Sequence, residues 1–105
     1  MNIGFRLTDK PIYFPGLEVK DHIYITRYKD MNLAVVIGLR GEVAKLSVNL
    51  SAYQYDKLLQ ENEFFITVDS KEVNDPCFST GLFEKVTEPF ELGPFKNKYQ
   101  IWRIK

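Results

Sequence analysis

Alternation between hydrophobic and polar residues predicts three consecutive β-strands in the first half of the chain. The predicted strands span residues 22–28, 33–39 and 42–50. The middle strand is apolar on both faces, which is typical of a central strand covered on both sides or of a contact between subunits. Arg40-Gly41 is a short connection in which glycine supplies the positive φ of a tight hairpin. The three strands are therefore predicted to form an antiparallel meander.

The strand predicted at 42–50 has the most regular alternation. Residues of a strand point alternately to its two faces, so one set should face the core and the other should face outward. The inward set is predicted to be Ala44, Leu46, Val48 and Leu50, and the outward set Val43, Lys45, Ser47 and Asn49.

The rest of the chain is predicted to add further strands and one or two short helices. Ser51 and Gln54 fit a capping box ahead of a helix over 52–60. Asp75-Pro76 is typical of the start of a second helix, which would end near Gly81. The remaining strands are predicted at 3–7, 64–68, 82–86 and 99–104, with an irregular or edge segment at 12–17 and a loop at 89–94. The predicted fold class is α+β: an antiparallel β-sheet, a meander of about five to six strands, with one or two short helices.

Length and composition indicate one small domain. With 105 residues, the chain is expected to fold as a single domain over 1–105. No apolar run approaches the ~18 residues of a membrane helix, and the first residues do not form a signal peptide. The single cysteine, Cys77, excludes an internal disulfide and a multi-cysteine zinc site. We expect a cytoplasmic protein that does not bind membranes.

Candidate catalytic and metal-binding residues are few. His22 is the only histidine and lies in a predicted strand, and the lone Cys77 is more typical of a small buried hydrophobic residue than of a nucleophile. Asp69, Glu72 and Asp75 have a spacing similar to that of calcium-loop acids, but the central glycine and the closing glutamate do not match. The sequence therefore predicts a non-enzymatic protein with no cofactor and no metal.

The charges are unevenly distributed, although the net charge is zero. Residues 53–95 hold nine acidic and three basic side chains, so their charge is 3 − 9 = −6. Residues 96–105 hold four basic side chains and no acidic one, which gives +4. Residues 1–52 hold seven basic and five acidic side chains, which gives +2. A surface of this kind is polarised if folding keeps the segments apart.

Two binding functions follow from this polarity. The acidic segment could engage a basic groove on a nucleic-acid enzyme or effector complex of the host, with exposed rings as anchors. The candidate partner-binding residues are Asp56, Glu61, Glu63, Asp69, Glu72, Asp75, Tyr53 and Tyr55.

The alternative is a nucleic-acid-binding module at the basic C-terminal strand, where rings stack on bases and cations follow the backbone. Its candidate residues are Lys96, Lys98, Tyr99 and Arg103. Trp102 falls on the opposite strand face and is predicted to be a core anchor. A third candidate function is a structural component that self-associates as a homo-oligomer through an edge strand or through 33–39.

Part of the chain resembles a family of small uncharacterised proteins, a domain of unknown function. The resemblance covers about residues 32–86. It is carried by Leu46-Ser47-Val48-Asn49-Leu50 and Glu61-Asn62-Glu63-Phe64-Phe65-Ile66, then by a short helix that ends in glycine (74–81) and the apolar Leu82-Phe83. Members of this family occur on phages, plasmids and conjugative elements of Gram-positive bacteria.

The resemblance implies no catalysis and no cofactor. It implies instead an accessory gene of a mobile element, and such genes often encode single-domain inhibitors of host defence. The expected function is therefore a counter-defence inhibitor, of the anti-CRISPR or anti-restriction type, that binds a host nuclease complex in the bacterial cytoplasm.

Overall fold

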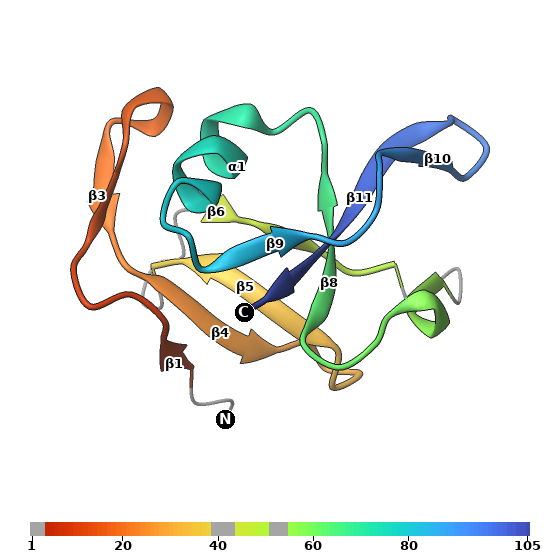
Figure 1. Ribbon diagram of the computed structural model, residues 1–105, viewed down its shortest axis with the longest axis horizontal. Helices are drawn as coiled ribbons and strands as arrows, with labels where there is room; N and C mark the ends of the chain where they lie inside the picture. Colours follow the sequence, from red (N-terminus) through yellow and green to blue (C-terminus); the bar gives the residue numbers. More distant parts are fainter. Residues whose placement is uncertain (1–3, 39–43, 51–54) are drawn as a thin grey trace.

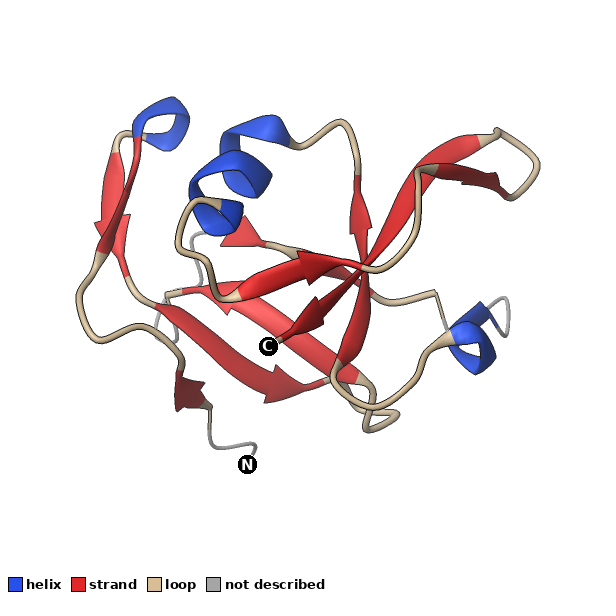
Figure 2. Ribbon diagram, viewed as in Figure 1, coloured by secondary structure: helices blue, strands red, loops and turns tan. Residues whose placement is uncertain are grey.

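The structure is a computed structural model, and it describes residues 4–38, 44–50 and 55–105. Within these residues the chain forms three antiparallel sheets, one α-helix and short 3₁₀ turns (Figures 1 and 2). The α+β class and the antiparallel pairing are confirmed. A single meander of five to six strands is wrong, because eleven strands are divided among three sheets in the described residues. No helix in these ranges has the length and apolarity that crossing a membrane would require.

The first sheet contains the centre of the predicted meander. Its strand order is β1-β4-β5-β6, and all pairs are antiparallel. Every residue of β5 is buried, so its two apolar faces are explained by cover on both sides. The strands are β1 (Phe5–Arg6), β4 (Ile23–Arg27), β5 (Leu33–Ile37) and β6 (Ala44–Lys45).

The second sheet is built around the C-terminal strand β11 (Asn97–Ile104). On one side β11 pairs with β8, and β8 pairs in turn with β7. On its other side β11 pairs with two short strands in succession, β10 near the start and β9 near the end. The segment predicted as a loop at 89–94 therefore contains a strand. The partners are β7 (Ser47–Val48), β8 (Glu63–Thr67), β9 (Phe83–Lys85) and β10 (Phe90–Leu92).

The segment between β9 and β10 bulges away from β11. Thr87 bridges the gap, because the Ile101 amide donates to its Oγ1 (3.1 Å) in place of a main-chain carbonyl. On the β9 side of the bulge, main-chain pairing with β11 resumes at Val86, whose amide donates to the Ile101 carbonyl (2.8 Å). A bulge of this kind lifts the chain off the sheet and leaves space beside it.

The strand predicted at 42–50 changes sheet at Leu46. Its first part, β6, pairs with β5, and its second part, β7, pairs with β8 in the other sheet. Ser47 was predicted to face outward, but it is buried. Its Oγ accepts the Val35 amide (2.9 Å) and bonds the Tyr28 hydroxyl (2.8 Å), so the side chain replaces ladder bonds lost at the crossing. The predicted connection at Arg40-Gly41 lies outside the described residues.

The helix α1 (Lys71–Phe78) begins earlier than the sequence predicted. Amides of its first turn, those of Val73 and Asn74, bond to the Ser70 carbonyl, at 3.1 and 2.9 Å. Pro76 lies inside the helix near its end, where its missing N–H removes one helical hydrogen bond. Gly81 has φ 77° in the turn that follows, as expected of a glycine after a helix end.

Of the helix predicted at 52–60, the described part is a 3₁₀ turn, η3 (Tyr55–Leu58). The predicted capping residues, Ser51 and Gln54, lie outside the described residues. The segment at 12–17 forms β2 (Ile12–Phe14) and the 3₁₀ turn η1 (Pro15–Leu17), and β2 pairs with β3 (Val19–Asp21) in a separate hairpin.

Two hydrophobic clusters lie on opposite faces of the second sheet. The larger cluster fills the space between the two main sheets and α1, and it includes Trp102, which is 2% exposed. The predicted role of Trp102 as a core anchor is confirmed. The smaller cluster, on the other face, is formed by Leu50, Phe65 and Ile101. These clusters cover much of both faces of this sheet, so its rim, the loops and the outer side of α1 offer surface for binding.

Candidate functional site

Acidic side chains are exposed along α1. Asp69 lies in the turn before the helix, and Glu72 and Asp75, three residues apart, occupy neighbouring positions on the helix surface. All three are exposed, and none forms an ion pair with a lysine or arginine in the part of the chain that the structure describes. We call Asp69, Glu72 and Asp75 the acidic face.

The turn η1 fixes the position of this helix. A side chain at Gly16 would place its Cβ 2.7 Å from the Cβ of Glu72, so the backbone of η1 and the helix approach closely only because Gly16 has no side chain. The contact uses the base of the Glu72 side chain and leaves the residue exposed to solvent.

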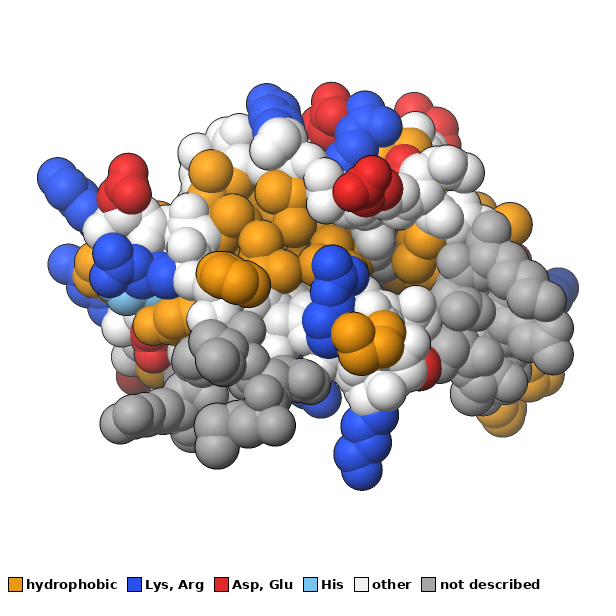
Figure 3. Space-filling model, turned by 90° about the horizontal axis from the view of Figure 1, so that it is seen from below, with side chains coloured by type: hydrophobic (Ala, Val, Ile, Leu, Met, Phe, Trp, Pro, Cys, Tyr) orange, Lys and Arg blue, Asp and Glu red, His pale blue; other side chains and the backbone are white. Residues whose placement is uncertain are grey.

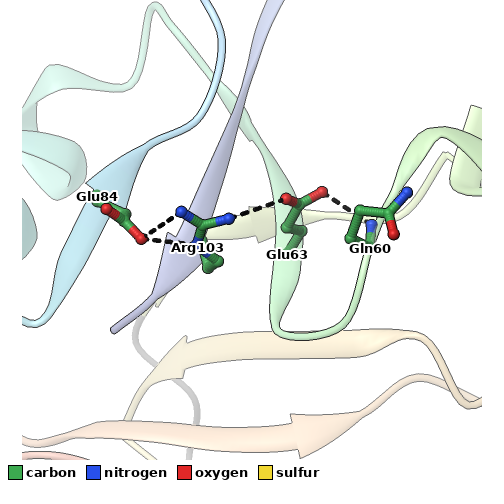
Figure 4. A network of polar contacts seen from close by, with 4 residues as sticks. All are labelled: Gln60, Glu63, Glu84 and Arg103. Carbon is green, nitrogen blue, oxygen red and sulfur yellow. Dashed lines mark hydrogen bonds and ion pairs between the residues drawn. The ribbon is translucent and has the colours of Figure 1, made fainter.

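Two residues assigned to different predicted sites bind each other. Glu63 was a candidate of the acidic surface and Arg103 a candidate of the nucleic-acid surface. Their strands pair at this register, and Glu84 faces Arg103 from the opposite side. Arg103 Nη2 lies 2.6 Å from Glu84 Oε1, and Arg103 Nη1 lies 3.7 Å from Glu63 Oε2 (Figure 4).

Glu63 is buried, and its second oxygen accepts the Gln60 amide (2.8 Å). The charges of Glu63 and Arg103 are therefore compensated within the molecule. They do not add free charge to either predicted binding surface.

The other predicted residues are dispersed. Glu61 is exposed in the turn before β8, away from the acidic face in sequence. Tyr55 is half-buried against the smaller hydrophobic cluster. Tyr53 lies outside the described residues, and so does the Asp56 side chain. Of the eight predicted partner-binding residues, the structure places Glu72 and Asp75 on α1 and Asp69 in the turn just before it.

A cavity of about 650 Å³ lies beside α1. The helix contributes Asn74 and Asp75 to its lining, and the bulge contributes Thr87 and Glu88. From the second sheet and its edge come Ile66, Val68, Gln100 and Trp102. Lys71 and Lys85 line the cavity too. Sequence analysis did not find this site, because the bulge that creates it depends on how β9 and β10 divide one side of β11.

Two buried carboxamides line this cavity. Gln100 is satisfied: its Nε2 donates to the Thr87 carbonyl (2.8 Å), and its Oε1 accepts the Trp102 indole N–H (2.9 Å). Asn74 is only 5% exposed, and its Nδ2 donates to the Thr67 carbonyl (2.7 Å). Its Oδ1 has no hydrogen-bond partner among the described residues. A buried acceptor without a partner costs about 1–3 kcal/mol, so this atom marks an incomplete polar site.

The hairpin of β10 and β11 carries the rest of the predicted basic surface. Its turn is closed by a hydrogen bond from the Lys96 amide to the Gly93 carbonyl (3.2 Å). Lys96 and Lys98 are exposed there, whereas Tyr99 is half-buried against the smaller cluster. Lys98 is opposite Glu91 in the strand register, which reduces the local positive charge.

Phe95, one of the rings interleaved with the basic residues of the nucleic-acid alternative, lies at the tip of this hairpin and is 85% exposed. The preceding Gly93-Pro94 pair is typical of a turn that can display the next side chain.

Apolar surface occurs elsewhere as well. Figure 3 shows hydrophobic side chains gathered on the underside of the molecule. Leu7 and Leu82, partly buried beside the larger cluster, line a groove of about 360 Å³. This groove is the structural candidate for self-association, whereas β5 is buried inside the sheet.

His22, the candidate base, and Cys77, the candidate nucleophile, both make contacts that belong to the packing of the fold. His22 Nδ1 lies 2.9 Å from Thr8 Oγ1 and 3.2 Å from the Thr8 carbonyl oxygen, contacts that connect the residue just before β4 to the segment after β1. Cys77 belongs to the larger cluster, and burial raises the pKa of its thiol to about 12. The thiolate needed for nucleophilic attack is therefore scarce at neutral pH. Within the described ranges, no three His, Cys, Asp or Glu side chains form a group that could hold a metal ion.

Comparisons of the chain with protein-family models, with curated proteins and with solved structures found no match.

Proposed function

We propose that this chain is a non-enzymatic interaction protein that binds a host protein through the acidic face. In the more specific form of the proposal, it is a counter-defence inhibitor of a phage or mobile element. Its partner would be a nuclease complex of the bacterial cytoplasm, in which a groove lined with lysine and arginine normally binds nucleic acid. The chain would then occupy that groove in place of phosphate.

The observation that supports this proposal is the unpaired charge on α1. Two exposed carboxylates on α1 and a third in the turn before it have no ion pair in the described residues, and Glu88 adds a fourth in the lining of the cavity. Clustered charge of one sign raises the rate at which a partner of the opposite sign associates. By contrast, Glu63 is neutralised inside the fold, so its charge does not contribute.

A pull-down with three matched baits tests the proposal. The baits are the natural chain, a Glu72→Lys/Asp75→Lys variant that reverses the acidic face, and a Lys96→Glu/Lys98→Glu variant that reverses the hairpin. Each is applied to a lysate of a Gram-positive host, with and without nuclease treatment. All four positions are exposed, so the variants are expected to fold.

The proposal predicts one protein partner, present in stoichiometric amount after nuclease treatment. The hairpin variant should retain it and the acidic-face variant should lose it. Equal recovery by all three baits at low salt would overturn the role of the acidic face.

The second candidate function is binding of single-stranded nucleic acid by the hairpin. It is favoured by Phe95, whose ring is exposed and flanked by Lys96, so that a base could stack on the ring while a phosphate meets the ammonium group. Fluorescence anisotropy with single-stranded DNA and RNA measures this directly. Affinity should fall steeply with salt and should be lost in Phe95→Ser. Flat titrations with both nucleic acids would exclude this function.

A further inference from the structure

We propose that the cavity beside α1 is the socket for an arginine side chain of the protein partner, an inference that rests on the function proposed above. The lining of the cavity presents carboxylate and carboxamide oxygens beside apolar side chains, and its volume of about 650 Å³ leaves ample room for an arginine side chain. Together these features indicate a ligand that carries several hydrogen-bond donors on a hydrocarbon stem.

Three of the groups that line the cavity, the Asn74 carboxamide oxygen and the carboxylates of Asp75 and Glu88, are acceptors. Asn74 Oδ1 is buried in the wall and has no partner among the described residues, and no ion pair there involves Asp75 or Glu88. A ligand that completes these groups has to supply N–H or O–H donors and positive charge. Because Asn74 is 95% covered, such a ligand has to enter the cavity rather than lie across its mouth.

A guanidinium group fits this set better than an ammonium group. It has five N–H donors and no acceptor, and they diverge in a plane, so one group can donate to two carboxylates and a carboxamide oxygen at once. The three methylene groups of arginine can lie on Ile66 and Val68, since the stem of this side chain is apolar. A lysine would supply fewer donors from a single point.

The two lysines that line the cavity do not reverse this charge preference. Lys85 Nζ lies 4.7 Å from the centre of the Phe78 ring, so its ammonium group already has a partner. Lys71 is exposed and lies four residues before Asp75, where it can move aside or compete with the ligand. Replacing Lys71 with glutamine should therefore strengthen arginine binding, by about twofold if the pair is worth what exposed helix pairs usually are.

The test uses a probe that does not depend on the host partner. Nα-acetyl-arginine amide is titrated into the ¹⁵N-labelled chain, with Nα-acetyl-citrulline amide, neutral and of the same shape, as control. The Asn74 and Gln100 side-chain amides and the Trp102 indole N–H report from inside the cavity. We expect these signals to shift with a dissociation constant on the order of 1 mM, the range for a ligand of this size. Citrulline should shift them much less.

Matched variants locate the binding. Glu88→Gln should weaken the probe about fivefold, as expected for one exposed ion pair. Asn74→Leu should weaken it at least as much. Glu91→Gln, an exposed change that does not line the cavity, should leave the affinity unchanged. Since Glu88 is exposed, the first variant stays informative even if the change at Asn74 disturbs the fold.

The outcomes separate this inference from the proposed function. Selective shifts with the arginine probe support the socket even if no host partner is captured, in which case the proposed function fails alone. No shift at 20-fold the expected dissociation constant, or equal shifts with citrulline, would overturn the socket. In that case, capture of a partner by the acidic face would still support the proposed function.

Discussion

Carboxylates occupy two contrasting regions of this molecule. Glu63 and Glu84 lie on either side of Arg103, in one row across three strands. Glu72 and Asp75 lie on α1 without an ion pair in the described part of the chain. The same residue type is structural in the first region and available for binding in the second. Counting charge along a segment cannot separate the two, because pairing is decided by which strands become neighbours.

The two groups of carboxylates also differ in how they contribute to the stability of the fold. Burying a charge is costly unless a partner and hydrogen bonds compensate it, and Glu63 has both, an ion pair and the Gln60 amide. The carboxylates on α1 remain hydrated, so they carry no such cost and contribute little to stability. Substitutions on α1 are therefore expected to cost less stability than substitutions in the row of Glu63, Arg103 and Glu84.

The largest effect is expected when the structural row loses its cation. Arg103→Met leaves the buried Glu63 carboxylate without its ion pair, and we expect the free energy of unfolding to fall by about 2 kcal/mol. This is below the usual cost of a fully buried pair, because Arg103 is 44% exposed. Urea denaturation at pH 7 measures it, with Lys96→Met, an exposed cation, as control. Equal effects of the two changes would show that the row is not structural.

A buried ionisable group on α1 provides a second contrast within one helix. The thiol of Cys77 has its pKa raised by burial from 9.0 to about 12, whereas the acidic side chains lie in water. The unfolded chain therefore loses this proton before the folded chain does. The contribution of the group to stability is complete below pH 9 and is lost between pH 9 and about 12.

This dependence is measured against Cys77→Val, in which the other titrating groups are unchanged. The difference in unfolding free energy between the two proteins should stay constant below pH 9 and shift by about 1.4 kcal/mol at pH 10, to the disadvantage of the natural chain. A constant difference up to pH 11 would mean that the thiol is not buried as described.

Neutralising one glutamate in each region compares them directly. Glu63→Gln keeps the shape and an acceptor for the Gln60 amide but removes the ion pair, and it should cost about 1 kcal/mol. Glu72→Gln is isosteric too, keeps the contact of its Cβ with Gly16, and should change stability by less than about 0.5 kcal/mol. Thermal unfolding of the two variants side by side is sufficient. A larger loss of stability in Glu72→Gln than in Glu63→Gln would contradict the contrast between the two regions.

The sequence predicted elements that depend on local pattern and missed those that depend on strand order. β5 was found because both of its faces are apolar, and Trp102 because its strand face is apolar. Ser47 was misplaced, since alternation continues through Leu46 while the chain crosses from one sheet to the other. The start of α1 was placed late because Pro76 is a common first helical residue and here lies near the helix end.

The candidate site was predicted in part. The spacing of Glu72 and Asp75 was visible in the sequence, but no pattern indicated that Arg103 would face Glu63 from another strand. The unpartnered Asn74 oxygen was equally invisible, because it results from contacts between α1 and the end of β8. Long-range register and packing determine which charges remain for binding, and neither is encoded in a short window of residues.

Neutralising two carboxylates of the acidic face should have the smallest effect on stability and a clear effect on the rate of association. In a Glu72→Gln/Asp75→Asn variant, stability should change by no more than about 0.5 kcal/mol, because both side chains are exposed. Attraction between opposite charges acts mainly on the association rate, and salt screens it over about 10 Å at 0.1 M. Stopped-flow association with the captured partner should therefore be slower for this variant at low salt and should converge with the natural chain as salt increases. Parallel salt curves would place the electrostatic contact elsewhere, with the exposed Glu61 as the next carboxylate to neutralise.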